Sequence, residues 1–285
     1  MDTSIDQHSE SSMKKVVYRQ FGERDVLQVV SSDMPSPQEG EVLIRVHGAG
    51  LNPIDWKTRK GFGFVAQQIE SSLPWTPGYD VAGEVVAIGD GVTTLAPRDR
   101  VMGMIGFPLD GGGYSEYALA RADELAIVPE ELDLVTAGAL PLAALTAWQA
   151  LFEVDFLAEL GVHEVIDYHT TDIADECYGL DVVLDLVGGD TGKRSLRTLG
   201  ENGMLVTVPT ITADEIISAA EELGLKAHGM TVRPDVFHLD EIAELIEDGD
   251  VKVHIEKAFS LDQVAQAHEL LEGGHVRGKL VLDCR

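Results

Sequence analysis

The stretch that most constrains the fold runs from Leu140 to Tyr168 and reads LPLAALTAWQALFEVDFLAELGVHEVIDY. Before it, short strand patterns are separated by Gly and Pro; after it, strand and helix patterns alternate as in a nucleotide-binding α/β domain. Such a domain begins with a strand and a Gly-rich turn. Between Phe152 and Val154 there is room for neither. The sequence therefore predicts an α/β plus β fold with a truncated parallel sheet.

The segment 13–130 carries many short β patterns, which favour a small β-barrel or a sandwich. Asp90-Gly91 follows the run VVAIG and predicts a tight hairpin, because Gly tolerates a positive φ. The strand patterns read KKVVYRQ, EVLIRVHGAG, VAGEVVAIGDGV, RVMGM and YSEYALA.

From about Leu132 the apolar spacing becomes helical, and three apolar runs then follow that are typical of parallel strands covered on both faces. These runs are EVIDY (164–168), DVVLDLV (181–187) and MLVTVP (204–209). We expect EVIDY to pair in parallel with DVVLDLV in a short four-stranded sheet, since both must be buried. Amphipathic helices are predicted within 213–224 and 237–249, and the chain closes with a strand, a helix and the strand GKLVLDC.

The charge balance excludes two classes of partner. The chain has 49 acidic and 21 basic residues, a net charge of −28, which repels nucleic acid and anionic membranes. Acidity spread along the whole chain is typical of halophilic proteins, and an ordinary acidic cytosolic protein is the alternative. No apolar run approaches the roughly 20 residues of a membrane span. Residues 1–12 are predicted to be a disordered acidic tail without an export signal, which indicates a cytoplasmic protein.

The sequence offers few catalytic motifs. The two cysteines, Cys177 and Cys284, are predicted to be free thiols, and no His or Cys has metal-ligand spacing. No GxGxxG, P-loop or GxSxG motif is present. VGGDTGKRSL (187–196) is a Gly-rich turn before a helix, and it either holds a phosphate or lines the crevice at the strand ends.

Five motifs, in order, resemble the medium-chain dehydrogenase/reductase superfamily, and its zinc-independent NADPH:quinone oxidoreductase (zeta-crystallin-like) branch in particular. They are AGLNPIDWKTRKG (49–61), PWTPGYDVAGEVVAIGDGVT (74–93), GGYSEYALARADELAIVP (112–129), ALPLAALTAWQALF (139–152) and EGGHVRGKLVL (272–282). The resemblance covers nearly everything after residue 13.

This resemblance implies a GroES-like catalytic domain at 13–132, completed by about 256–285, and a truncated Rossmann-type nucleotide-binding domain at 133–255. The active site would lie in the cleft between them. Zinc-dependent relatives carry Cys where this chain has Asn52 and a His-Glu pair where it has Tyr79-Asp80. The resemblance thus implies an NADPH-dependent, zinc-free enzyme that passes hydride to a quinone or an α,β-unsaturated carbonyl.

The resemblance also implies the site residues. Asn52 contacts the nicotinamide end of the cofactor, and Trp56 and Arg59 line the acceptor pocket. Thr146 supplies a hydroxyl beside the nicotinamide, and Tyr168 lies near the adenosine 2′-phosphate. The residues expected to cover the cofactor are Gly188, Gly189, Val208, Pro209, Arg277, Gly278 and Lys279.

The departure from the family lies at the junction described first. Relatives continue from ALTAWQALF through a βαβ unit of roughly 30 residues, and this chain lacks it, together with the turn that holds the pyrophosphate. Three hypotheses remain: an active reductase, a catalytically impaired remnant or binding protein on the same scaffold, and an internally truncated gene product. A homodimer joined through the strand KAHGMTV (226–232) is also expected.

Overall fold

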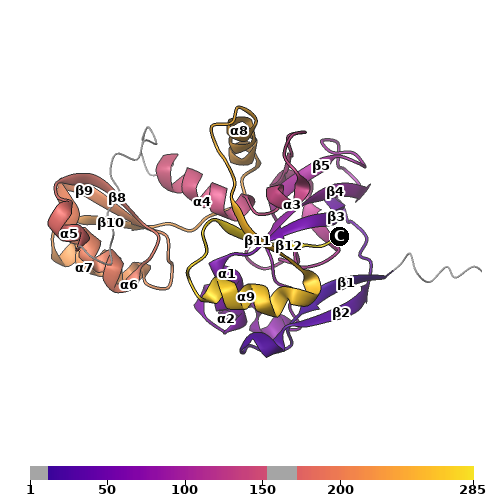
Figure 1. Cartoon of the computed structure of the whole chain (residues 1–285), viewed down its shortest axis with the longest axis horizontal. Helices are drawn as coiled ribbons and strands as arrows, with labels where there is room; N and C mark the ends of the chain where they lie inside the picture. The colour runs from indigo at the N-terminus through magenta and orange to yellow at the C-terminus, as the bar shows by residue number, and fades with distance from the viewer. Residues whose placement is uncertain (1–11, 153–171) are drawn as a thin grey trace, which may run out of the picture. The chain divides into compact units, whose positions relative to one another are not determined.

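The computed structural model describes residues 12–152 and 172–285 (Figure 1). The chain forms two compact units. Unit 1 combines the chain up to Leu145 with Arg233–Arg285, and unit 2 is Thr146–Val232. Within the described ranges, no helix is long and apolar enough to cross a bilayer.

Unit 1 is built on a seven-stranded sheet and a separate two-stranded sheet. The large sheet has the order β11-β12-β3-β4-β5-β7, with β6 paired to β3, and β1 pairs with β2. The strands of the two sheets are β1 (Ser12–Val17), β2 (Gln28–Asp33), β3 (Glu41–Gly50), β4 (Asp80–Ile88), β5 (Arg100–Met104), β6 (Tyr117–Arg121), β7 (Leu125–Ile127), β11 (Ile255–Ser260) and β12 (Lys279–Asp283). The C-terminal strands thus complete the sheet begun by the N-terminal segment.

The predicted barrel is not closed within the described residues, because β3 divides the sheet. One edge of β3 pairs with β4 along most of its length. The other edge pairs with β6 over residues 41–45 and with β12 over residues 48–50. The sheet therefore forks at β3. The mixed α/β and β architecture predicted from the sequence is confirmed.

Short helices surround this sheet. The α-helices of unit 1 are α1 (Pro53–Arg59), α2 (Gly63–Ile69), α3 (Leu134–Ala137), α8 (Val236–Glu247) and α9 (Val264–Glu272). The 3-10 helices are η1 (Arg24–Val26), η2 (Glu70–Ser72), η3 (Ala122–Glu124) and η5 (Leu261–Gln263). Because α3 packs on β3 and α8 on β7, both belong to unit 1, so the unit boundaries differ from the predicted domain boundaries at 132 and 255.

The period-two alternation of the strands divides the core of unit 1 between two faces. Val81 and Val101 belong to one apolar cluster, which includes Val264 and Ala267 of α9. The next residue of each strand belongs to a second cluster, which includes residues of α3 and α8. The sheet is therefore covered on both sides, which explains why its strands read as nearly continuous apolar runs.

Two glycines allow α3 to contact β3 through the backbone. A Cβ atom on Gly48 would lie 2.6 Å from the carbonyl oxygen of Val135, and one on Gly138 would lie 2.3 Å from that of Gly48. Real Cβ atoms do not approach backbone oxygens so closely. This crossing therefore requires glycine at both positions.

We expect Gly138→Ala to lower the free energy of unfolding by about 2–3 kcal/mol, because the methyl group must push α3 away from β3. Gly273→Ala is a matched control. Gly138 (φ −63°, ψ −14°) and Gly273 (φ −64°, ψ −17°) both follow a helix in the same conformation, but a Cβ on Gly273 meets no atom nearer than 3.3 Å. Its effect should stay below about 1 kcal/mol. Urea unfolding measures the effect of both substitutions. Equal losses of unfolding free energy would contradict the close backbone contact between α3 and β3.

Unit 2 contains a parallel sheet of the order β10-β9-β8. Its elements are α5 (Ile173–Glu176), β8 (Leu180–Asp185), α6 (Gly189–Ser195), η4 (Leu196–Thr198), β9 (Leu199–Thr207), α7 (Ala213–Glu222) and β10 (Lys226–Gly229), and α4 (Pro141–Phe152) begins in unit 1 and ends in unit 2. Leu205 packs with residues of α7, whereas Val206 packs with Ala150 of α4. Both faces of β9 are thus covered, as the apolar run predicts. The predicted pairing of EVIDY lies outside the described residues, as does most of the 1–12 tail.

Candidate functional site

Asn52 sits at the start of α1, where the local sequence fixes its backbone. It precedes Pro53, whose ring favours the first position of a helix, and has extended dihedrals (φ −130°, ψ 154°). Its N–H donates to Oδ2 of Asp55, three residues on, at 2.8 Å. This Asn-x-x-Asp spacing corresponds to a capping box. It holds Asn52 at the end of β3, beside β4 and β12.

The Asn52 triad comprises Asn52, Asp80 and Lys279. The Asn52 amide donates to Oδ2 of Asp80 at 2.7 Å, and the Lys279 ammonium donates to Oδ1 of Asn52 at 2.5 Å and to the carbonyl of Leu51 at 3.2 Å. The ammonium lies 3.9 Å from Oδ2 of Asp80. Asn52 is 1% exposed and Asp80 0%, so the triad is a buried, hydrogen-bonded group.

Asp80 also connects β4 to a second helix. Its Oδ1 accepts the N–H of Leu142, in the first turn of α4, at 2.7 Å. Burial raises the pKa of Asp80, and Lys279, the Asn52 amide and the Leu142 N–H oppose this rise. Burial lowers the pKa of Lys279, while Asp80 and Asp55 oppose that shift. Each charge of the pair therefore stabilises the other in a site that disfavours both.

A second buried carboxylate, Asp55, adjoins the triad. Its Oδ2 accepts the Asn52 N–H and the Tyr114 hydroxyl, the latter at 3.0 Å, and its Oδ1 has no partner. Burial raises the pKa of Asp55 to about 7, although these two hydrogen bonds oppose the shift. Asp80 raises this pKa further and Lys279 lowers it. Asp55 therefore gains or loses a proton near neutral pH.

Asp55 should make the stability of unit 1 pH-dependent. The folded pKa of about 7 exceeds the unfolded value of about 3.9, so the folded state binds the proton more tightly. The stabilising contribution is complete below about pH 4 and is lost as the pH rises through 7. Through Asp55, the wild-type protein should therefore lose about 2–3 kcal/mol of its free energy of unfolding between pH 5 and 8. The Asp55→Asn variant should not show this loss.

Urea unfolding at several pH values measures this difference. Asp262→Asn is the control, because Asp262 is an exposed carboxylate of the same unit. Parallel pH curves for wild type and Asp55→Asn would contradict the assignment.

Trp56 and Arg59 follow Asn52 on α1 but lie in different surroundings. Trp56 is half-buried, and the ammonium groups of Lys57 and Lys60 lie 5.8 and 5.7 Å from its ring centroid. The Arg59 guanidinium is 0% exposed and donates to Oε1 of Glu272 on α9 at 2.8 Å and to the carbonyl of Gly22 at 3.2 Å. These contacts give Arg59 a structural role, which argues against its predicted place in an acceptor pocket.

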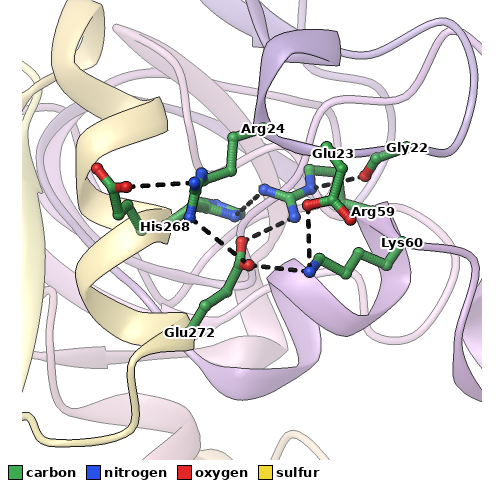
Figure 2. Close-up of polar contacts among 8 residues, drawn as sticks. Gly22, Glu23, Arg24, Arg59, Lys60, His268 and Glu272 are labelled. Carbon is green, nitrogen blue, oxygen red and sulfur yellow. Dashed lines mark hydrogen bonds and ion pairs between the residues drawn. The ribbon is translucent and has the colours of Figure 1, made fainter.

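Figure 2 shows Arg59 within the α1–α9 cluster, which consists of Glu23, Arg24, Arg59, Lys60, His268, Glu269 and Glu272. Nη1 of Arg59 lies 3.4 Å from Nδ1 of His268. Burial lowers the pKa of His268 to about 3, and the charge of Arg59 adds to the shift. The histidine is therefore neutral at physiological pH, and the cluster fastens α9 to α1.

The predicted loop 277–279 has one inward and one outward side chain. The Arg277 side chain is exposed, and Gly278 has φ +90°, with His254 occupying the space a Cβ would need. The Lys279 ammonium instead faces Asn52 and Asp80 inside unit 1. These contacts, and that with the carbonyl of Leu51, all lie within unit 1. This placement supports a role in holding Asn52 rather than in covering a cofactor.

In unit 2 the structure brings Gly188 next to Pro209, as expected for loops at neighbouring strand ends. A Cβ on Gly188 would lie 3.0 Å from that of Pro209. Oδ1 of Asp185 accepts the N–H groups of Val187 and Gly188, at 3.0 and 2.8 Å. The N–H of Gly189 donates to Oγ1 of Thr212 at 3.0 Å. The three N–H groups of this turn are thus already bonded within the protein.

The remaining predicted residues lie apart from one another. Val208, which precedes Pro209, is half-buried and donates its N–H to the Asp185 carbonyl at 3.0 Å. Thr146 is half-buried on α4 in unit 2. Tyr168 lies outside the described residues. The predicted site residues are thus divided between the two units.

Two of the three residues at the zinc-ligand positions, Asn52 and Tyr79, do not fit that metal. Asn52 offers a neutral amide, and the Tyr79 hydroxyl donates to the carbonyl of Pro108 at 2.9 Å, with a pKa raised by burial. Zinc prefers thiolate, imidazole and carboxylate ligands. No group of three or more His, Cys, Asp or Glu side chains that could hold a metal occurs in the described part of the chain.

Sequence reasoning missed three polar residues of these sites. Asp55 had a usable signal, the Asn-x-x-Asp spacing at a helix start. Asp185 had a weaker one, a carboxylate that ends an apolar strand before a Gly-rich turn. Tyr114 had none, since its partner Asp55 lies 59 residues away in the sequence.

Both halves of the chain match known protein families. Residues 38–130 match the alcohol dehydrogenase GroES-like domain, and residues 160–282 match the family described as zinc-binding dehydrogenase. The 2-methylene-furan-3-one reductase of Solanum lycopersicum is 30% identical over 332 positions, which cover 99% of this chain and 81% of that protein. Because 332 positions exceed the 285 residues of this chain, the relative carries segments that have no counterpart here.

Solved structures agree with these matches. The quinone oxidoreductase of Coxiella burnetii is 35% identical and superposes with a TM-score of 0.92, covering 96% of this chain and all of that one. The Escherichia coli quinone oxidoreductase complexed with NADPH shares the fold at 22% identity, with a TM-score of 0.83 and coverage of 95% of this chain and 99% of that one. This chain therefore belongs to the medium-chain dehydrogenase/reductase superfamily, in its quinone-oxidoreductase-like branch.

Proposed function

We propose that this protein is an NAD(P)H-dependent oxidoreductase that transfers hydride to a quinone or an α,β-unsaturated carbonyl. The observation that carries the proposal is the Asn52 triad, a buried amide held between a carboxylate and an ammonium at the start of α1. The full-length likeness to a solved quinone oxidoreductase supports it. We retain Trp56 and Thr146 as proposed neighbours of the reactants, and we assign Arg59 to the scaffold.

The residues of the triad fit the nicotinamide end of such a cofactor. The Asn52 amide has two N–H donors and two lone pairs, and its partners within the protein use one of each. The remaining donor and acceptor complement a carboxamide. The nicotinamide supplies the hydride when it is bound. Asn52 would orient that group, and the buried surroundings would strengthen its hydrogen bonds.

The Gly188–Gly189 turn does not fit a phosphate, because Asp185 and Thr212 already accept the turn's N–H groups. We therefore assign no phosphate contact to this turn. Arg277, an exposed cation on the loop before β12, remains a proposed contact for the cofactor. NADPH is proposed over NADH only by resemblance, and the absence of zinc is proposed from the donor set.

The alternative of an impaired remnant is not favoured. The chain covers the whole length of the solved Coxiella burnetii protein at 35% identity, and that protein bears the name of a quinone oxidoreductase. The two alternatives differ in one measurable quantity, which is hydride transfer.

The test is a fluorescence titration of the protein with NADPH and with NADH, followed by oxidation assays with a quinone and an enone. We expect saturable binding and acceptor-dependent oxidation in molar salt, which screens the −28 net charge. A parallel variant carries a relative's βαβ unit inserted after Phe152. Binding and turnover only in that variant would overturn the proposed activity of the natural chain.

We also propose a cytoplasmic, halophilic homodimer joined through β10, an outer strand of the described three-stranded sheet. Acceptors are small molecules, and nucleic acid and membranes are not proposed partners. Light scattering in molar salt should give twice the monomer mass of 30.8 kDa. A proline at His228 in β10 should reduce this mass to that of the monomer if the strand forms the interface.

A further inference from the structure

We propose that Lys279 and Asp80 are positioning residues, which hold the Asn52 carboxamide in one fixed orientation for hydride transfer. The proposal rests on the proposed function. It replaces the expectation that Lys279 covers the cofactor, and it gives Asp80 a role that its place at a former zinc position does not suggest.

The first support is the distinct chemistry of the two partners. An ammonium can only donate hydrogen bonds, and an ionised carboxylate can only accept them. Lys279 contacts the oxygen of the Asn52 amide at 2.5 Å, and Asp80 contacts its nitrogen at 2.7 Å. A 180° rotation of the amide would place two donors together and two acceptors together. The two partners therefore exclude the flipped rotamer.

The second support is the rigidity of the partners themselves. Asp80 lies in β4, paired on both sides, with Oδ1 bonded to the N–H of Leu142 and Oδ2 to Asn52. Lys279 lies in β12, and its ammonium also donates to the carbonyl of Leu51. Neither group can follow a rotating amide without breaking a further bond. The side chains of Asp80 and Lys279 are 0% and 18% exposed, so water is a poor substitute.

The third support concerns the strength of the free N–H. A cation on the amide oxygen draws electron density away from the nitrogen, and hydrogen bonds linked in this way strengthen one another at low local dielectric. The N–H that Asn52 does not give to Asp80 is thereby a stronger donor than that of an isolated amide. Because Asn52 is 1% exposed, a nicotinamide carboxamide or an acceptor carbonyl would reach this donor only after the side chains that cover it move aside.

The chain offers a direct experiment, because it contains only two asparagines, Asn52 and Asn202. In protein labelled with ¹⁵N at asparagine alone, the NMR spectrum contains two side-chain NH₂ groups, each with two hydrogens. The Asn202→Ala variant shows which of the two groups belongs to Asn52. We expect the two Asn52 hydrogens to be distinct and to exchange slowly with solvent in wild type. In Lys279→Met and in Lys279→Met/Asp80→Asn, they should exchange at least tenfold faster.

The kinetic measurement uses the same variants. Both should lower kcat about 10- to 100-fold and leave the KM for the acceptor within about twofold, since the fold and pocket are retained. The double variant removes both charges, so it keeps unit 1 folded if the single variant does not. Lys252→Met, at an exposed lysine of the same unit, is the control and should match wild type in both measurements.

The outcomes separate this proposal from the proposed function. Unchanged Asn52 signals in the variants would overturn the positioning role even if the enzyme is active. Altered signals with unchanged kcat would show that the pair holds the amide but that catalysis does not need it, and this too would overturn the proposal. A wild-type chain with slow Asn52 exchange but no hydride transfer would contradict the proposed function, and with it a role in hydride transfer.

Discussion

Arg59→Met should lower the free energy of unfolding by about 3–5 kcal/mol, because it breaks a buried ion pair from one side. The guanidinium is 0% exposed and donates to Glu272 and to Gly22. Methionine fills a similar volume but leaves the Glu272 carboxylate, whose side chain is 12% exposed, without its shortest charged contact. Denaturant unfolding of the full chain measures the loss.

Arg24→Met is the matched control within the α1–α9 cluster. Arg24 is 37% exposed, and its partners are Glu269 at 3.2 Å and Glu272 at 3.9 Å. Exposed pairs of this kind contribute up to about 1 kcal/mol. Arg59→Lys should resemble Arg59→Met, since one ammonium cannot reach all partners of the planar guanidinium. Equal losses in Arg59→Met and Arg24→Met would contradict the structural role of Arg59.

Asn52→Ala should lower kcat/KM for hydride transfer by about 10²- to 10³-fold, the loss typical of removing one preorganised donor. The substitution leaves Lys279 3.9 Å from Asp80, so the two charges still compensate each other. The substitution keeps the backbone N–H that donates to Asp55, so the start of α1 should be retained. Steady-state oxidation of NADPH with a quinone measures the effect, and unfolding curves confirm that the variant is folded.

Asn202→Ala is the natural control, because Asn202 is the second asparagine of the chain and is exposed on β9. It should leave kcat/KM within about twofold. An Asn52→Ala protein with full activity would remove Asn52 from the proposed site, and the positioning role of Lys279 and Asp80 would fall with it.

The sequence best predicts the structural features that depend on residues close together in the chain. The apolar runs DVVLDLV and MLVTVP correspond to β8 and β9. Only β9 is covered on both faces, as a continuous apolar run predicts, whereas β8 is partly buried and Leu186 and Val187 after it are exposed. The start of α1 likewise follows from Asn52, Pro53 and Asp55 within one turn. The family resemblance singled out Asn52, whose contact with a nicotinamide stays a prediction, and it did not reveal the partners of the Asn52 side chain.

The surroundings of the other side chains depend on contacts between residues far apart in the sequence. Lys279 was expected to face a cofactor, and only the pairing of β12 with β3 brings it within reach of Asn52, 227 residues earlier in the chain. Arg59 was expected to line a pocket, and its actual partner Glu272 is 213 residues away. Asp185 accepts the N–H groups of the residues two and three positions later in the chain. No sequence motif indicates that these donors are already bonded within the protein.

The position of β12 between β11 and β3 has a consequence for synthesis on the ribosome. Every other described strand of the large sheet is translated before β12, so β11 and residues 48–50 of β3 lack this partner until residues 279–283 emerge. Unit 2 is complete in the nascent chain by Val232 and can fold earlier. The buried Asp80 gains its ammonium partner only at this last step, so the Asn52 triad forms after translation of the sheet is finished.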